Sequence, residues 1–335
     1  MTGVKIDPVV WKPPRAGARA TQRESAEPLP SLTLLSLPGI GPEDVVVGAS
    51  GEVYTGLADG RVVRVDPETG EVTTVGDTGG RPLGLEVLPD GRLLVCDSHR
   101  GLLRLDPVTG TVERLVESVG GRALTFASNV VAASDGTIYF TESSTRFHIE
   151  HWKAAIVEHR SDGRLFRLDT EGRVDVLLDG LSFANGVALT PDETAVVVAE
   201  TGTYQLTRLM LTGPRAGTKD VLVGNLPGSP DNLSIDADGT LWVALASARD
   251  ARLDRLLAAP PVVRKLVMAV PERLQPAVRR TVWVLGVDPN GRIIRDLQGS
   301  GGAFAMATGV VRHGHRLYLG SLIGSAVAVL DLGGT

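Results

Sequence analysis

One short unit recurs along the sequence and constrains the fold more than any other feature. It comprises an apolar strand, a turn with Gly, Pro or Asp, and a second strand rich in β-branched residues, as in LSFANGVALTPDETAVVVAE from Leu181 to Glu200. The turn and second strand return as SGEVYTG, PDGRLLVCD, SDGTIYFTE, ADGTLWVAL and HGHRLYLGS. Aligned on the turn, the six repeats fall at Gly51, Gly91, Gly136, Glu193, Gly239 and His315, about 40 to 47 residues apart except across two longer gaps. We therefore expect an all-β, six-bladed β-propeller.

The two ends of the sequence predict how the ring closes. Blade 6 has its third strand at Ser325 to Leu330, and the sequence ends at Thr335, which leaves too few residues for a fourth strand. We expect Leu32 to Leu37 to supply that strand and so cover the open edges of the ring. Residues 1–30 are then an N-terminal arm or tail, and residues 31–335 form the propeller.

Two insertions, at about residues 146–162 in blade 3 and about 249–281 in blade 5, predict a helical cap. Both link a second strand to a third strand, so they should leave the propeller on the same face. The first contains His148 and His151, whose spacing would suit a shared metal site. A helix that lies on the surface or lines the pocket is favoured instead, with His148 as a candidate acid or base over the site.

The second insertion is basic, with apolar residues at helical spacing interrupted by Pro260 and Pro261. A lid that packs on the propeller is the favoured interpretation. The alternative is peripheral contact of residues 249–280 with an anionic membrane.

The start of each innermost strand predicts the functional site. Seven or eight residues before each turn stand Glu43, Leu83, Asn129, Asn185, Asp231 and Ala307. Residues in the same phase of a radial repeat lie at one height around the axis, so four oxygen-bearing side chains should converge at the channel mouth, with Asn232 as a fifth group. Such ligands suit Ca²⁺. Each residue alone would be explained by turn chemistry, but their shared position in four of six repeats favours a metal site.

Composition excludes several function classes. A net charge of −5 and 4% aromatic residues argue against binding of nucleic acid. The single Cys96 excludes an intramolecular disulfide and fits a reducing compartment, so we expect a cytoplasmic location. We expect no signal peptide and no transmembrane segment, because no apolar core of either kind is present. The oligomeric state is not predicted.

Four stretches, TESSTRF, LLDGLSFANGVALTPDE, AETGTYQLTRLMLTGPRAGT and LPGSPDNLSIDADGTLWVAL, resemble the strictosidine synthase-like family. This family lies within the group of six-bladed propellers that includes SMP-30/gluconolactonases, paraoxonases and diisopropyl fluorophosphatase, and the resemblance covers about residues 31–332. It implies that Glu43, Asn129, Asn185 and Asp231 hold a catalytic Ca²⁺. Alkaloid-forming members use a glutamate in blade 6, whereas no Glu or Asp lies between Gly299 and Val311 here. Strictosidine synthase-type condensation is therefore disfavoured.

These observations predict a calcium-dependent hydrolase of small-molecule carboxylic esters or lactones, of the arylesterase or lactonase type. The ion would polarise the carbonyl, and Asp231 would act as nucleophile or as base. The alternative is a non-catalytic propeller binding module with a structural Ca²⁺.

Overall fold

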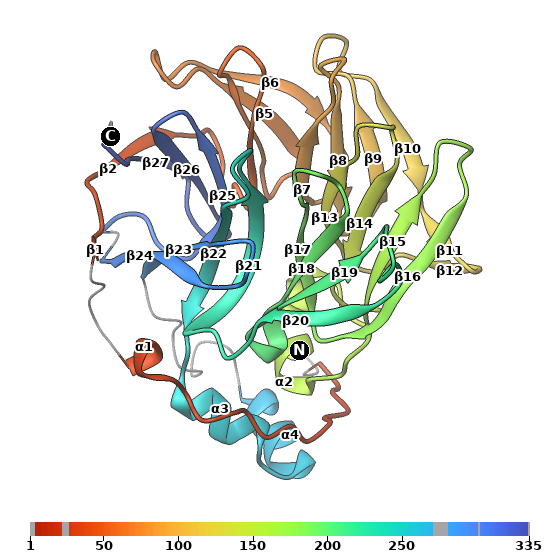
Figure 1. Ribbon diagram of the computed structural model, residues 1–335, viewed down its shortest axis with the longest axis vertical. Coiled ribbons are helices and arrows are strands. Elements are labelled where there is room, and N and C mark those ends of the chain that lie inside the picture. Colours follow the sequence, from red (N-terminus) through yellow and green to blue (C-terminus); the bar gives the residue numbers. More distant parts are fainter. Residues whose placement is uncertain (1–3, 22–26, 271–280, 301, 334–335) are drawn as a thin grey trace.

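The computed structural model describes residues 4–21, 27–270, 281–300 and 302–333. In this part of the chain, six sheets of four or five strands stand around a central axis (Figure 1). The innermost strands contact one another in the order β3, β7, β13, β17, β21 and β25, and β25 contacts β3 again. The prediction of a six-bladed β-propeller is thus confirmed.

The blades follow the order of the sequence. Blade 1 is β3 (Val45–Val47), β4 (Val53–Gly56), β5 (Arg61–Val65) and β6 (Val72–Asp77), and blade 2 is β7 (Pro82–Val87), β8 (Leu93–Asp97), β9 (Gly101–Leu105) and β10 (Val112–Val116). Blade 3 is β13 (Ala127–Ala132), β14 (Ile138–Glu142), β15 (Gly163–Leu168) and β16 (Val174–Leu181), and blade 4 is β17 (Ala184–Leu189), β18 (Ala195–Glu200), β19 (Gln205–Met210) and β20 (Lys219–Val223). Blade 5 is β21 (Gly228–Ile235), β22 (Leu241–Ala248), β23 (Val282–Val287) and β24 (Ile293–Gly299), and blade 6 begins with β25 (Ala307–His313), β26 (Arg316–Ser321) and β27 (Ala326–Asp331). A short hairpin, β11 (Ser118–Val119) and β12 (Arg122–Ala123), follows blade 2.

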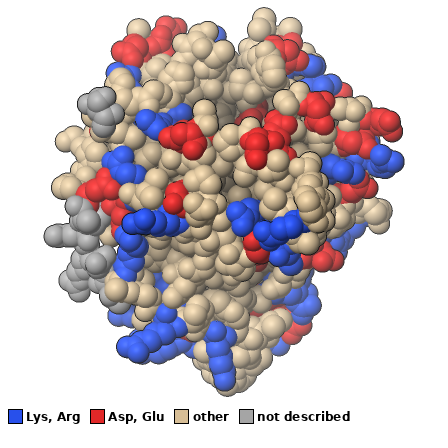
Figure 2. All heavy atoms as spheres, in the orientation of Figure 1, with Lys and Arg blue, Asp and Glu red and all other residues tan. Residues whose placement is uncertain are grey.

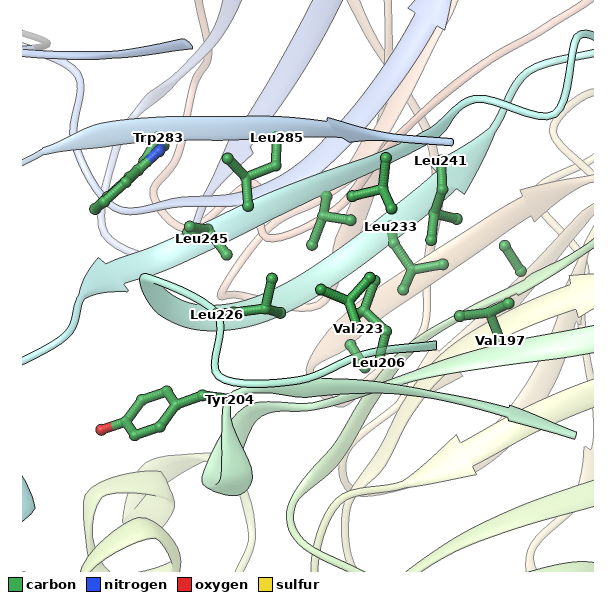
Figure 3. Close-up of a cluster of buried hydrophobic side chains, with 14 residues drawn as sticks. Val197, Tyr204, Leu206, Val223, Leu226, Leu233, Leu241, Leu245, Trp283 and Leu285 are labelled. Atoms are coloured by element: carbon green, nitrogen blue, oxygen red, sulfur yellow. The ribbon is translucent and has the colours of Figure 1, made fainter. Parts of the chain in front are cut away.

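Burial explains why the second strands read as continuous apolar runs. Every residue of β8 and of β18 is buried, because neighbouring blades cover both faces of these strands. The outermost strands β6 and β10 instead mix exposed and buried positions. Between blades 4 and 5, Val197, Leu206, Leu233 and Leu285 belong to one buried cluster (Figure 3). The hydrophobic core therefore consists of layers between adjacent blades rather than one central mass.

The ring closes as predicted, through an N-terminal strand. β2 (Leu32–Ser36) pairs with β27 in antiparallel register, with Leu32 opposite Leu330 and Ser36 opposite Ala326. A second N-terminal strand, β1 (Glu27–Pro28), adds to the outer edge of blade 5, parallel to β24. Both strands cover edges that would otherwise offer unpaired backbone groups.

Closure by β2 predicts different effects for two adjacent leucines. Leu35 is 7% exposed and packs in the cluster between blades 6 and 1, whereas Leu34 is 38% exposed. Leu35→Ala should lower the free energy of unfolding by about 2–4 kcal/mol. Leu34→Ala, the matched control, should lower it by less than about 1 kcal/mol. Urea unfolding of both variants checks this, and equal losses would contradict the closure.

Helices lie in both insertions, at one end of the propeller (Figure 1). The first forms η1 (Ile149–His151) and α2 (Trp152–Glu158), and the second forms α3 (Ala251–Leu257) and α4 (Pro261–Ala269). α4 contacts both α2 and α3. Residues 271–280 of the second insertion lie outside the described residues. Within the described residues, no helix has the length and apolar character needed to cross a membrane.

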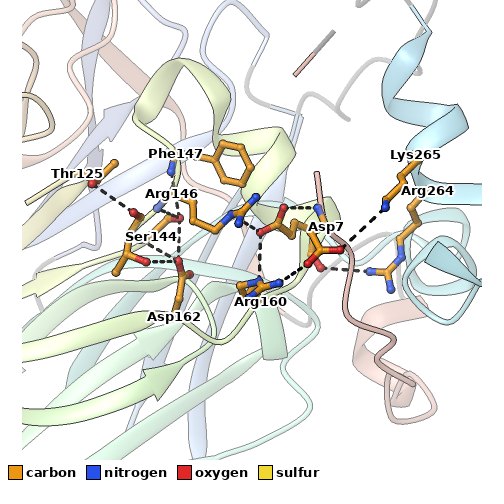
Figure 4. A network of polar contacts seen from close by, with 11 residues as sticks. Asp7, Thr125, Ser144, Arg146, Phe147, Arg160, Asp162, Arg264 and Lys265 are labelled. Carbon is orange, nitrogen blue, oxygen red and sulfur yellow. Dashed lines mark hydrogen bonds and ion pairs between the residues drawn. The ribbon is translucent and has the colours of Figure 1, made fainter. Parts of the chain in front are cut away.

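The N-terminal arm runs across these helices, and a short helix, α1 (Ala18–Thr21), follows it. The Asp7 backbone N–H donates to Glu158 Oε2 at 2.6 Å, and the Trp11 N–H donates to the Leu257 carbonyl at 3.2 Å. The Trp11 ring stacks on His159 with 4.4 Å between ring centroids. Figure 4 shows Asp7 between Arg160 and Lys265. The arm therefore links α2, α3 and α4.

Candidate functional site

A β-bulge at the start of the innermost strand sets the position of the site residues. In blade 4, Ala184 pairs with Glu200 and Val187 pairs with Val198, so two residues stand between paired positions. The same irregularity occurs in blades 2, 3, 5 and 6. Bulges of this kind are common next to functional sites because they redirect side chains.

Each bulge places two consecutive residues in two layers around the channel. The first residue belongs to an upper layer, which faces the cap helices, and the second belongs to a lower layer, further from the cap. In blade 1, which has no bulge of this kind among the paired residues, the strand register puts Glu43 and Asp44 in the equivalent positions. The upper layer consists of Glu43, Leu83, Ser128, Asn185, Asp231 and Thr308, and the lower layer of Asp44, Gly84, Asn129, Gly186, Asn232 and Gly309. Five of the six upper residues line a cavity between the propeller and the cap helices, namely Glu43, Leu83, Ser128, Asn185 and Asp231.

This register corrects the predicted position of Asn129. The sequence count placed Asn129 in one ring with Glu43, Asn185 and Asp231, but Ser128 occupies that register in blade 3. Asn129 belongs to the lower layer, where its Nδ2 donates to Asp44 Oδ2 at 3.0 Å and its Oδ1 accepts from the Val187 N–H at 3.2 Å. Asn129 is thus one layer lower than predicted, in the layer that also contains Asn232, and its role as a ligand stays a prediction.

Each upper carboxylate accepts a hydrogen bond from an amide. Asn185 Nδ2 donates to Asp231 Oδ1 at 2.5 Å, and Ser128 Oγ donates to Asn185 Oδ1 at 2.8 Å. Asn232 Nδ2 donates upward to Glu43 Oε1 at 3.1 Å. Ser128, Asn185 and Asp231 thus form a chain across three blades, and Asn232 joins the two layers.

Glycines in alternate blades make room for the lower layer. A Cβ atom on Gly84 would lie 2.4 Å from Asn129 Cα, and one on Gly186 would lie 2.6 Å from Asn232 Cα. Gly309 approaches Asp44 in the same way. The close approach of the innermost strands therefore requires glycine beside each polar residue of this layer.

Three threonine hydroxyls donate hydrogen bonds to main-chain carbonyl groups at the site. Thr308 Oγ1 donates to the Glu43 carbonyl, Thr141 Oγ1 to the Asn185 carbonyl and Thr201 Oγ1 to the Pro230 carbonyl, each at 2.6 Å. The site residues are consequently held by their main chains as well as by their side chains.

The carboxylates of the site are buried and close enough to interact. Glu43, Asp44 and Asp231 are 6%, 6% and 7% exposed. Burial, and secondly the charge of Asp44, raises the pKa of Glu43 to about 8, and burial raises the pKa of Asp44 to about 6. Burial, followed by the charges of Glu43 and Asp44, raises the pKa of Asp231 well above its usual range. Charge on buried carboxylates this close together is costly unless cations compensate it, and the buried Arg81 does so in part because its charge lowers the pKa of Glu43.

Two buried oxygen atoms of the site are available to a cation. Glu43 Oε2 and Asn232 Oδ1 are among the buried side-chain atoms of the described residues that have no hydrogen-bond partner. Unpaired buried oxygens are uncommon, and hard oxygen donors of this kind are the ligands that Ca²⁺ prefers. In the described residues no group of three or more His, Cys, Asp and Glu side chains suits a metal, so amide oxygens would have to complete the ligand set.

The cavity above this polar floor is mainly apolar and has a volume of about 290 Å³. Its walls come from the innermost strands and from the cap. They include Phe126, Ile149, Trp152, Ile156, Phe183, Leu253, Leu256, Val267, Met268 and Met306. Such a site can hold an apolar molecule with one polar group directed at the carboxylates.

His148 is exposed and does not line this cavity. Its Nδ1 lies 3.2 Å from the Ser98 carbonyl, and its ring faces His99 at 5.2 Å between centroids. This placement does not support the predicted role of His148 as an acid or base over the site. Other residues of the first insertion do line the cavity, among them Ile149, Trp152 and Ile156.

Sequence reasoning missed Ser128 and Asp44 as members of the site. Ser128 stands eight residues before the turn at Gly136, the spacing that also gives Glu43, Asn185 and Asp231. A strict count of eight would have found it. Asp44 gave no separate signal, because it follows Glu43 directly and belongs to the lower layer.

The fold and the site define a six-bladed propeller with a capped, apolar cavity over buried carboxylates and amides. The family model of the SMP-30/Gluconolactonase/LRE-like region matches residues 53–270, and that of the strictosidine synthase-like N-terminal region matches residues 26–65. The chain belongs to this SMP-30/gluconolactonase and strictosidine synthase-like group. It is 35% identical over 319 residues to an adipocyte plasma membrane-associated protein of Salmo salar, covering 88% of this chain and 76% of the relative.

Two solved structures share the fold at lower sequence identity. One is a gluconolactonase from Xanthomonas campestris, with a TM-score of 0.66, 19% identity and 99% of each chain covered. The other is regucalcin, a calcium-binding protein from Agrobacterium tumefaciens, with a TM-score of 0.64, 15% identity, and 90% of this chain and 94% of that chain covered.

The comparisons overturn one prediction made from the sequence. We predicted a cytoplasmic location from the single cysteine, whereas relatives of fish, rat and human are named for association with the plasma membrane. Cysteine content reports only the redox state that a chain tolerates, so it is a weak guide to location.

Proposed function

We propose that the protein is a calcium-dependent hydrolase of carboxylic esters or lactones that carry an apolar acyl or aryl part. The observation that supports this most is the placement of two buried carboxylates, Glu43 and Asp231, at the floor of an otherwise apolar cavity. The gluconolactonases in its family support hydrolysis of an ester bond.

Glu43, Asn185, Asp231 and Asn232 are the residues that would hold the ion. When bound, Ca²⁺ would act as a Lewis acid that stabilises negative charge on the carbonyl oxygen. Ser128 would orient the Asn185 amide through the 2.8 Å hydrogen bond between them.

Asp231 would carry the chemistry in one of two ways. As a nucleophile, its carboxylate oxygen would attack the carbonyl carbon, the ester C–O bond would break with a proton from water going to the departing alcohol oxygen, and water would then hydrolyse the acyl–aspartate anhydride to regenerate the carboxylate. As a base, Asp231 would take a proton from a water molecule while the water oxygen attacks the carbonyl carbon, and it would return this proton to the alcohol oxygen as the ester C–O bond breaks. The apolar walls would exclude other water in both cases.

A panel of substrates tests the proposal. Purified protein should hydrolyse phenyl acetate and an alkyl-substituted γ-lactone, and kcat/KM for the alkyl lactone should exceed that for glucono-δ-lactone by at least about tenfold, because the cavity walls are apolar. EDTA should abolish turnover and excess Ca²⁺ should restore it.

Each failure has a separate meaning. Turnover that survives EDTA would show that the ion is not required. Binding of Ca²⁺ with no turnover on any ester or lactone would favour the alternative of a propeller binding module.

A further inference from the structure

The outward side of the cap exposes large apolar side chains. On α4 and its C-cap, Val262 is 62% exposed, Val263 39%, Leu266 67% and Val270 39%. Val9 and Val10 of the N-terminal arm are each 47% exposed. We call these six residues the outer cap face.

Packing of α4 does not use these residues. The helix is held from its other side, where Val267 and Met268 line the cavity. Arg264 is fully buried, and its Nη1 donates to the Val157 carbonyl at 3.0 Å. α4 is therefore apolar on both sides, and only its inner side has a partner within the described protein.

The arm brings Val9 and Val10 to the cap, where the Val9 N–H donates to the carbonyl of Glu158 at the end of α2 at 2.9 Å. They lie between Asp7, whose carboxylate is 4.0 Å from Lys265 Nζ, and Trp11, whose N–H donates to the Leu257 carbonyl. Two segments far apart in the sequence thus both carry exposed apolar residues on the cap.

Basic residues accompany the outer cap face. Exposed cations on the arm and on α3 and α4 include Lys5, Lys12, Arg255 and Lys265, whereas Arg252 lines the cavity. The nearby acids are engaged within the protein: Asp7 pairs with Arg160, Asp250 caps α3, and Asp254 pairs with Arg249. In Figure 2 blue atoms gather at the lower end of the molecule, where Figure 1 places α3 and α4.

We propose that the outer cap face docks on an anionic lipid bilayer. An exposed apolar helix face with adjacent Lys and Arg is the combination that binds such a surface, since the apolar side chains enter the interface and the cations meet the headgroups. Because the other side of α4 lines the cavity, docking would hold the cap, and with it the cavity, at the bilayer. The proposal does not depend on the hydrolase activity.

Vesicle co-sedimentation tests the docking. Full-length protein should sediment with phosphatidylcholine vesicles that contain about 30% phosphatidylserine, and binding to pure phosphatidylcholine or at high salt should be much weaker. The double variant Val262→Gln, Leu266→Gln should bind the anionic vesicles about tenfold or more weakly, because both side chains are more than half exposed in the free protein. Lys265→Gln with Arg255→Gln should reduce binding and its salt dependence.

The matched control is Val108→Gln with Val221→Gln, which changes two side chains that are 92% and 54% exposed and lie outside the cap. This control should bind like the wild type, and all variants should keep the wild-type melting temperature. Failure of the wild type to bind anionic vesicles, or unchanged binding by the Val262/Leu266 variant, would overturn the proposal. A dimer that this variant converts to a monomer, without vesicle binding, would show instead that a second copy covers the face.

Discussion

Asp231→Asn should lower ester or lactone turnover by about two to four orders of magnitude, the range typical of a lost acid–base group. Asparagine keeps the shape of the side chain and one oxygen for the ion, but it cannot attack a carbonyl or accept a proton from water. Saturating Ca²⁺ should therefore still raise the melting temperature of the variant. Initial rates at saturating Ca²⁺, read beside thermal unfolding, separate the two properties.

Asp179→Asn provides the control for this experiment, because Asp179 is exposed on the outer strand β16. It should leave both turnover and calcium stabilisation unchanged. If the Asp231 variant regains wild-type turnover at high Ca²⁺, Asp231 only holds the ion and the base must be another group.

Glu43→Gln should abolish stabilisation by Ca²⁺ and should stabilise the calcium-free protein at alkaline pH. The pKa of Glu43 is raised to about 8 from an ordinary value of 4.5, first by burial, so the folded protein keeps this proton to a higher pH than the unfolded chain does. The folding stability that the protonated side chain contributes is fully present below pH 4.5, the pKa of the unfolded chain. It is lost as the pH rises from there through about 8. At about 1.4 kcal/mol per pH unit, a pKa raised from 4.5 to about 8 should make the calcium-free variant several kcal/mol more stable than the wild type at pH 9.

Glu86→Gln is the matched control for Glu43→Gln. Glu86 lies further along the innermost strand β7, does not line the cavity, and burial raises its pKa to about 8 as well. Its replacement should also stabilise the calcium-free protein at alkaline pH, but stabilisation by Ca²⁺ should persist. Loss of calcium stabilisation in both variants would show that the effect is not specific to the proposed ligand.

The fold could be predicted from the sequence because each blade repeats the same local signals. The turns at Gly51, Gly91, Gly136 and Gly239 have positive φ between 83° and 89°, and Glu193 takes the same position at 53° in blade 4. The closing strand β2 followed from counting the strands of blade 6. Both inferences use periodicity and strand number, which survive small errors in boundaries.

The site was less predictable, because a bulge changes which residue faces the cavity. The count of seven or eight residues found Glu43, Asn185 and Asp231, but in blade 3 the difference of one residue separates Ser128 from Asn129. A shift of one position along a strand moves a side chain to another layer. Sequence alone did not fix that register.

Contacts made by irregular segments were the hardest to foresee. The arm was expected as an arm or tail, and nothing in its composition indicated that the Trp11 ring would stack on His159 or that the Asp7 N–H would reach Glu158. His148 was placed over the site from its insertion alone, although the path of that insertion directs it toward Ser98. Loops follow tertiary packing, and these segments carry no periodic pattern to constrain them.

Calcium titration by calorimetry, on chelator-treated wild type and on Glu43→Gln in parallel, tests directly whether the proposed site binds Ca²⁺. We expect one Ca²⁺ bound per wild-type chain, with a rise in melting temperature that follows the ion concentration, and no specific binding by the variant. Absence of binding heat from the wild type, or equal binding by both proteins, would contradict a calcium site built on Glu43 and Asp231.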